Sequence, residues 1–177
     1  MNKRDLKDLF EQYYKQSLNS FEGNSSSITV IESVKSIVGI NLNKDSANLM
    51  LWLDDYMQDY KVEKFHFNDN LESPPEVISY KNLESSIVDK DVEKSFKNIS
   101  YLSTVSDGTQ IMEFLLELSL RYSFETFQLI WSIYRMEMFL SRKFLSSSLQ
   151  VCVKSLIEGI TRHVVLDNSH VEWIDLL

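Results

Sequence analysis

Residues that break helices are scarce in this chain, which has only 4 glycines and 2 prolines among its 177 residues. The prolines are adjacent, as Pro74 and Pro75, so the sequences on both sides are free to form long helices. A single cysteine, Cys152, cannot form a disulfide within the chain. A chain without internal disulfides is typical of a reducing compartment, and we expect an intracellular, cytoplasmic protein.

Long apolar runs and an excess of basic charge are missing as well. No stretch of about 18 uninterrupted apolar residues occurs, so we expect no membrane span. The N-terminus leads into an amphipathic acidic segment, unlike the apolar core of a signal peptide. With a formal net charge of −8 the surface repels phosphate groups, so direct nucleic-acid binding is not expected.

The sequence does contain many apolar residues at helical spacing. This periodicity predicts helices at residues 3–18, 27–38, 44–60, 89–104, 107–122, 124–141 and 146–160. A short strand around Ile28 and Val30 remains an alternative, because β-branched residues are dense there. The predicted fold class is all-α, a single globular bundle of about six to seven helices.

The segment Phe124–Ser141 is apolar on almost every side. It keeps one narrow polar stripe, made of Gln128, Ser132, Arg135 and Arg142. A helix that is apolar nearly all round needs neighbours on most sides. We therefore predict that this segment is a buried central helix and that Trp131 belongs to the core.

Helix boundaries are indicated by residues that cap helix ends. The predicted N-caps are Asn43, Asp89, Asp107 and Ser123. Asp107 is followed three residues later by Gln110, which is the spacing of a capping box. Gly39 is expected to end the second helix.

The chain is expected to form one domain with an irregular middle. Residues 1–67 make an N-terminal helical part, and residues 68–88 make an irregular loop or linker. Residues 89–177 make a C-terminal helical core that packs with the N-terminal part. The periodicity fails from about residue 62 to 81, and the proline pair disfavours helix just before it.

No arrangement of residues indicates catalysis, a metal site or a cofactor. Cys152 lies between two valines and is expected to be a small core residue and not a reactive thiol. The histidines His66, His163 and His170 are scattered, and one cysteine does not complete a zinc ligand set. The glycines form no phosphate-binding loop and no nucleophile elbow. The sequence therefore predicts a protein that is not an enzyme.

Five residues are candidates for contact with a protein partner: Arg121, Arg135, Lys154, Glu158 and Trp173. Arg135 either pairs internally, with Glu113 or Glu117, or faces a partner. Trp173 lies in a short acidic tail and docks either against the body of the protein or against a partner.

The block 107–163 resembles a cyclin box, particularly that of the P-type cyclins. The resemblance is carried by Ile111–Leu115, Arg121–Thr126, Ile133-Tyr134, Phe139–Ser141, Leu149-Gln150 and Asp167–His170. It implies a five-helix unit that binds a protein kinase, with contacts near Arg121, Lys154 and Glu158. The Asp-Arg pair that the family carries near the end of its second helix has no counterpart here.

Two classes of function follow. The first is a non-enzymatic protein-interaction or regulatory subunit, with a cyclin-like mode of binding a protein kinase. The alternative is a small acidic inhibitor or immunity-type protein that binds a basic toxin or nuclease, or a structural subunit of a larger assembly.

Overall fold

The computed structural model describes residues 3–21, 26–40, 46–58 and 79–167, and within these ranges the chain forms helices and no strand. The eight helices are α1 (Lys3–Asn19), α2 (Ser26–Ile40), α3 (Ala47–Gln58), α4 (Tyr80–Val88), α5 (Val92–Val105), α6 (Gly108–Leu120), α7 (Phe124–Phe139) and α8 (Leu145–Asp167). The all-α prediction is confirmed. The strand alternative is wrong, because Ile28 and Val30 lie in α2.

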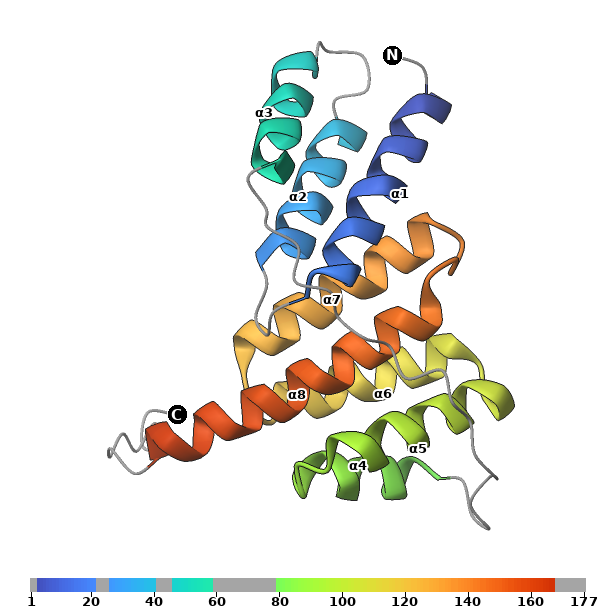
Figure 1. Ribbon diagram of the computed structural model, residues 1–177, viewed down its shortest axis with the longest axis vertical. Helices are drawn as coiled ribbons and strands as arrows, with labels where there is room; N and C mark the ends of the chain where they lie inside the picture. The colour runs from blue at the N-terminus through green and yellow to red at the C-terminus, as the bar shows by residue number, and fades with distance from the viewer. Residues whose placement is uncertain (1–2, 22–25, 41–45, 59–78, 168–177) are drawn as a thin grey trace.

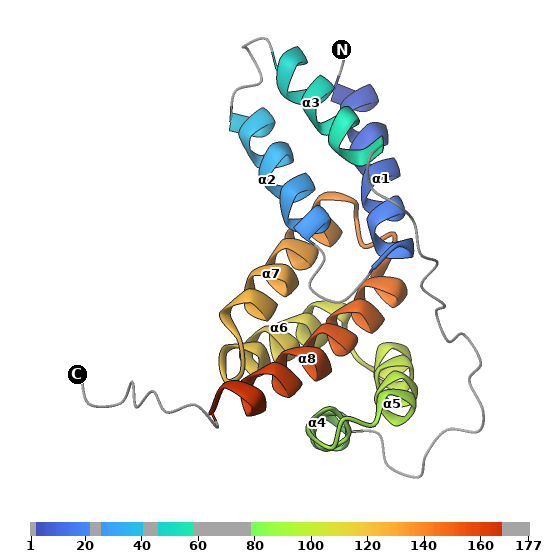
Figure 2. The ribbon, with the colours of Figure 1, turned by 60° about the vertical axis from the view of Figure 1, so that its left-hand side comes forward.

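The helices form two groups that meet at α7 and α8. Helices α1, α2 and α3 stand together at one end, and α4, α5 and α6 lie at the other (Figures 1 and 2). Contacts of α2 with α7 and of α1 with α8 join the groups. The buried apolar side chains form one cluster with members from all eight helices, so the two groups share a core.

The helix with neighbours on most sides is α8. It contacts α1, α4, α5, α6 and α7, and it crosses the middle of the molecule (Figure 1). Its segment 148–153 is buried at every position, which explains why Cys152 is a core residue, as predicted. The burial of this segment on every side is thus matched by packing on several faces.

The predicted burial of Phe124–Ser141 is wrong. Helix α7 contacts α2, α6 and α8 and leaves one face open. Phe124, Trp131 and Met138 lie seven residues apart on that face and are 71%, 43% and 51% exposed. Trp131 is therefore not a core residue, and its ring stacks instead on Tyr134 at 5.7 Å between centroids.

Side-chain caps set the starts of α4, α5, α6 and α7. The side chains of Ser79, Asp91, Asp107 and Ser123 each accept a hydrogen bond from a backbone N–H in the first turn of the following helix. The predicted N-caps at Asp107 and Ser123 are therefore confirmed. Asp89 is not an N-cap: it ends α4, and Lys90 then takes a left-handed φ of 60° before α5 begins.

Helix α4 lies in the range that was predicted to be irregular. For residues 80–88 that prediction is wrong, because Ser79 caps a helix that buries Leu83 and Ile87 on one face. The remainder of that range up to residue 78, the predicted cap Asn43 and the tail with Trp173 lie outside the described residues. Gly39 lies one residue before the end of α2.

Candidate functional site

The residues predicted to contact a partner are spread over several elements. Arg121 follows α6, Arg135 lies on α7, and Lys154 and Glu158 lie on α8. Lys154 and Glu158 form an ion pair one turn apart, with Nζ and Oε1 separated by 3.9 Å. The structure thus distributes these four side chains over three places and does not gather them into one site.

Arg135 has a structural role, but its partner differs from the two glutamates that the sequence suggested. Its Nε lies 2.9 Å from Oε1 of Glu32 on α2, and neither Glu113 nor Glu117 is its partner. It also donates to the hydroxyl of Ser36, which itself donates to Glu32. The nearly buried Glu32 carboxylate further pairs with Lys35 at 3.4 Å. Arg135 therefore holds α2 against α7 through a carboxylate that the sequence did not indicate.

An open groove lies between the start of α4 and the outer face of α6. We call it the acidic groove, and it is lined by Tyr80, Gln110, Glu113, Phe114 and Glu117. Its volume is about 420 Å³, which is large enough for side chains of another molecule.

Two aromatic rings form the apolar wall of the acidic groove. The rings of Tyr80 and Phe114 lie 4.9 Å apart between centroids, at an angle of 52°. The hydroxyl of Tyr80 is held 2.7 Å from that of Ser106, and Ser106 also donates to the amide oxygen of Gln110 at 3.3 Å. The wall is therefore fixed by hydrogen bonds from the connection between α5 and α6.

The described residues in and beside the groove include more carboxylates than cations. Arg121 donates to Glu117 at 3.3 Å and to Glu84 at 2.9 Å, so one guanidinium serves two carboxylates. Glu113 is exposed, and no cation in the described part of the chain pairs with it. Among the described residues, the rim of the groove therefore carries more carboxylates than cations.

This combination of groups suits a cationic side chain. A lysine ammonium or an arginine guanidinium is attracted by the face of an aromatic ring and by a carboxylate, and the two attractions act together. The described residues of the groove are therefore suited to binding a cation. In the described ranges no group of three or more histidine, cysteine, aspartate or glutamate residues could hold a metal ion.

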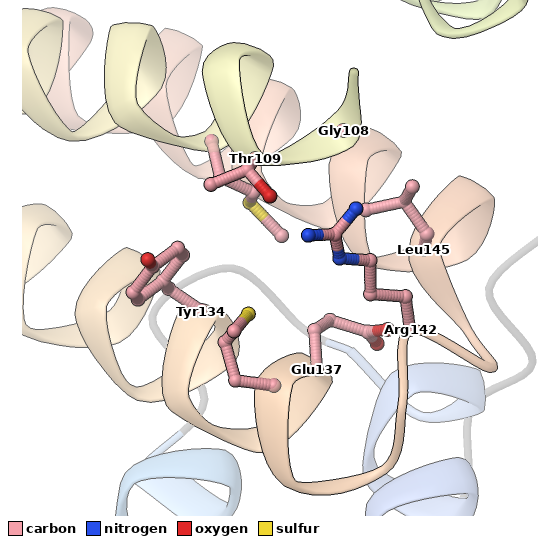
Figure 3. A pocket seen from close by; sticks show the side chains of 8 residues that line it. Gly108, Thr109, Tyr134, Glu137, Arg142 and Leu145 are labelled. Atoms are coloured by element: carbon pink, nitrogen blue, oxygen red, sulfur yellow. The ribbon is translucent and has the colours of Figure 1, made fainter.

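A second cavity lies between the start of α6, the end of α7 and the loop that follows α7. Figure 3 shows Arg142 reaching into it from that loop, with Thr109 and Tyr134 on its walls. Its volume is only about 10 Å³, so nothing larger than a water molecule fits. Arg142 donates to Asp107, the cap of α6, at 2.8 Å. We assign this cavity a structural role.

Next to that cavity a buried carboxylate links α1, α7 and α8. Glu137 is 2% exposed and accepts from the hydroxyl of Ser148 at 2.6 Å and from the backbone N–H of Phe144 at 3.3 Å. Burial raises the pKa of Glu137, and these hydrogen bonds oppose the rise. Burial, together with the Glu137 charge, also raises the pKa of the Cys152 thiol, which makes it a poor nucleophile.

Sequence reasoning missed the acidic groove. The exposed acidic side of α6 was visible as Glu113 and Glu117, one turn apart. Tyr80 could not be placed opposite them, because its segment had no predicted helix. The pairing of Tyr80 with Phe114 depends on tertiary packing, for which the sequence contains no local signal.

The comparisons with known proteins leave the family of the chain open. No protein-family model, no curated protein and no solved structure matches it. Within the described residues, no helix is both long and apolar enough to cross a membrane.

Proposed function

We propose that this chain is a non-enzymatic protein-interaction subunit that binds a basic segment of another protein in the acidic groove. The observation that carries the proposal is the exposed carboxylate of Glu113, which pairs with no cation among the described residues and lies beside the ring wall of Tyr80 and Phe114. A cationic side chain placed there neutralises the rim and lies against an aromatic face.

The charge of the whole chain supports the same class of partner. At a net charge of −8 the protein attracts a basic surface from a distance and accelerates the encounter. The exposed carboxylates are screened by salt over a Debye length of about 8 Å at physiological ionic strength. Binding through the groove is therefore expected to weaken as salt is added.

The groove favours the acidic inhibitor or immunity-type function over the other partner classes, because a basic toxin or nuclease presents the complementary charge. A cyclin-like kinase-binding subunit stays a prediction that rests on the resemblance of residues 107–163. In that case Arg121, Lys154 and Glu158 form the contact, and Glu158→Ala weakens the kinase complex. A structural subunit of an assembly needs no salt-sensitive contact at the groove.

Affinity capture from native cells tests the proposal when groove and control variants are compared. The groove variant is E113Q/E117Q, and the control is D8N/D55N, which removes two exposed carboxylates from α1 and α3. We expect a basic protein to be retained by wild type and by D8N/D55N at low salt, and to be lost with E113Q/E117Q. A partner captured equally by both variants contradicts binding in the groove.

A further inference from the structure

Beyond the acidic groove, the exposed side of α6 ends beside two large apolar side chains that are also exposed. Leu120, the last residue of α6, is 64% exposed, and Phe124, the first residue of α7, is 71% exposed. Phe124 is held in place by a stack on Phe127, with ring centroids 6.4 Å apart. Single exposed apolar residues are common, but two large ones at the end of a charged groove form a contact surface.

The spacing along α6 relates the two parts. Glu113, Glu117 and Leu120 follow one another at intervals of four and three residues, so they lie on one side of the helix. With a rise of about 1.5 Å per residue, Leu120 lies about 10 Å along the axis from Glu113. A helix that packs beside α6 and runs parallel to it has the same rise, so its own positions i, i+4 and i+7 face these three residues.

We propose that the partner of the acidic groove is an amphipathic helix with basic residues at positions i and i+4 and a large apolar residue at i+7. This inference rests on the proposed function and names the chemistry of its partner. The basic residue at i meets Glu113, the basic residue at i+4 meets Glu117 in place of Arg121, and the apolar residue packs on Leu120 and Phe124. A helix with this order of basic and apolar residues makes both kinds of contact only when it runs parallel to α6.

The two parts of the surface contribute differently to binding. Exposed ion pairs are screened by salt, so on their own they give a weak and salt-sensitive complex. Burial of apolar side chains is not weakened by moderate salt. A partner that uses both parts therefore keeps measurable affinity at a salt concentration that removes the ionic contribution.

The test uses two labelled helical peptides and fluorescence anisotropy with the full chain. The first peptide carries arginine at i and i+4 and leucine at i+7, and the second has serine in place of that leucine. The protein variants are E113Q/E117Q and L120S/F124S. The matched control is I40S/L51S, which replaces exposed apolar residues of α2 and α3. Circular dichroism confirms that each variant is folded.

We expect L120S/F124S to lower the affinity for the leucine peptide five- to twentyfold and to leave the affinity for the serine peptide unchanged. The thermal unfolding of this variant should match that of wild type. I40S/L51S should bind both peptides as wild type does. If wild type binds the two peptides with equal affinity, the inference is overturned. The proposed function still stands in that case if E113Q/E117Q weakens the binding of both peptides. If L120S/F124S abolishes peptide binding and E113Q/E117Q does not, the groove is not the ionic site, and both proposals are overturned.

Discussion

The hydroxyl of Tyr14 on α1 lies 2.8 Å from the hydroxyl of Ser148 on α8, in the buried centre of the protein. Ser148 in turn donates to the carboxylate of Glu137 on α7. This chain of hydrogen bonds ties the N-terminal helices to the helix that occupies the middle of the fold. It also gives a buried carboxylate donors that an apolar core could not provide.

Removal of the Tyr14 hydroxyl is expected to lower the free energy of unfolding by about 1–2 kcal/mol, because a buried hydrogen bond is lost. The change is Tyr14→Phe, measured by urea denaturation. Tyr134→Phe is the matched control: that ring is only partly buried, and its stack on Trp131 is kept. A Tyr14→Phe protein as stable as the control contradicts the role of this hydrogen bond.

The raised pKa of Glu137 predicts a pH dependence of stability. Because folding raises this pKa above the unfolded value of 4.5, the group favours the folded state most at low pH. That contribution is lost as pH rises through the folded pKa and the buried carboxylate ionises. We expect the unfolding free energy of wild type minus that of Glu137→Gln to fall as the pH rises above the unfolded pKa of 4.5. A difference that is constant or rises with pH contradicts this.

The ion pair of Arg135 with Glu32 is expected to matter more for stability than the pairs of Arg121. Loss of Arg135 leaves the nearly buried Glu32 carboxylate without its closest cation, at a cost of about 1–2 kcal/mol. The pairs of Arg121 are more exposed, and their loss costs at most about 1 kcal/mol. Chemical denaturation of Arg135→Gln and Arg121→Gln compares the two. If Arg121→Gln lowers the unfolding free energy as much as Arg135→Gln, or more, the Arg135–Glu32 pair is not the more important of the two.

Two glycines should respond in opposite ways to replacement by alanine. A Cβ at Gly159 would lie 2.5 Å from Oγ1 of Thr126, where α7 and α8 approach closely, so Gly159→Ala should destabilise by about 1–3 kcal/mol. A Cβ at Gly39 meets nothing within 4 Å, and Gly39→Ala should stabilise α2 by about 0.5–1 kcal/mol. Thermal unfolding measures both. A Gly159→Ala protein as stable as wild type would show that the helices can separate without cost.

The features that could be predicted from the sequence are those with local causes. The caps Asp107 and Ser123 act within their own first turn, so they were found without knowledge of the fold. The buried face of α1 follows from the spacing of its apolar residues. Asp89 and Asp91 are equivalent as sequence signals, and only the packing of α4 determines which of them caps α5.

Features that depend on distant segments could not be predicted. The sequence suggested Glu113 or Glu117 as the internal partner of Arg135, and the actual pairing with Glu32 depends on how α2 crosses α7. The pattern of α7 is the same for a helix that is buried and for one that exposes Trp131 and Phe124, because apolar residues are also found on surfaces. The acidic groove needs Tyr80 beside α6, which no local pattern specifies.

The binding of a basic segment in the acidic groove is tested most directly by an NMR titration. Isotope-labelled protein is titrated with the peptide acetyl-Gly-Arg-Gly-Arg-Gly-amide, and backbone amide shifts are followed in wild type, E113Q/E117Q and D8N/D55N. We predict that the largest shifts fall at Tyr80, Glu113, Phe114 and Glu117, that D8N/D55N behaves as wild type, and that E113Q/E117Q weakens binding about tenfold. Shifts spread evenly over the acidic residues of the protein, or unchanged in E113Q/E117Q, would contradict the proposed function.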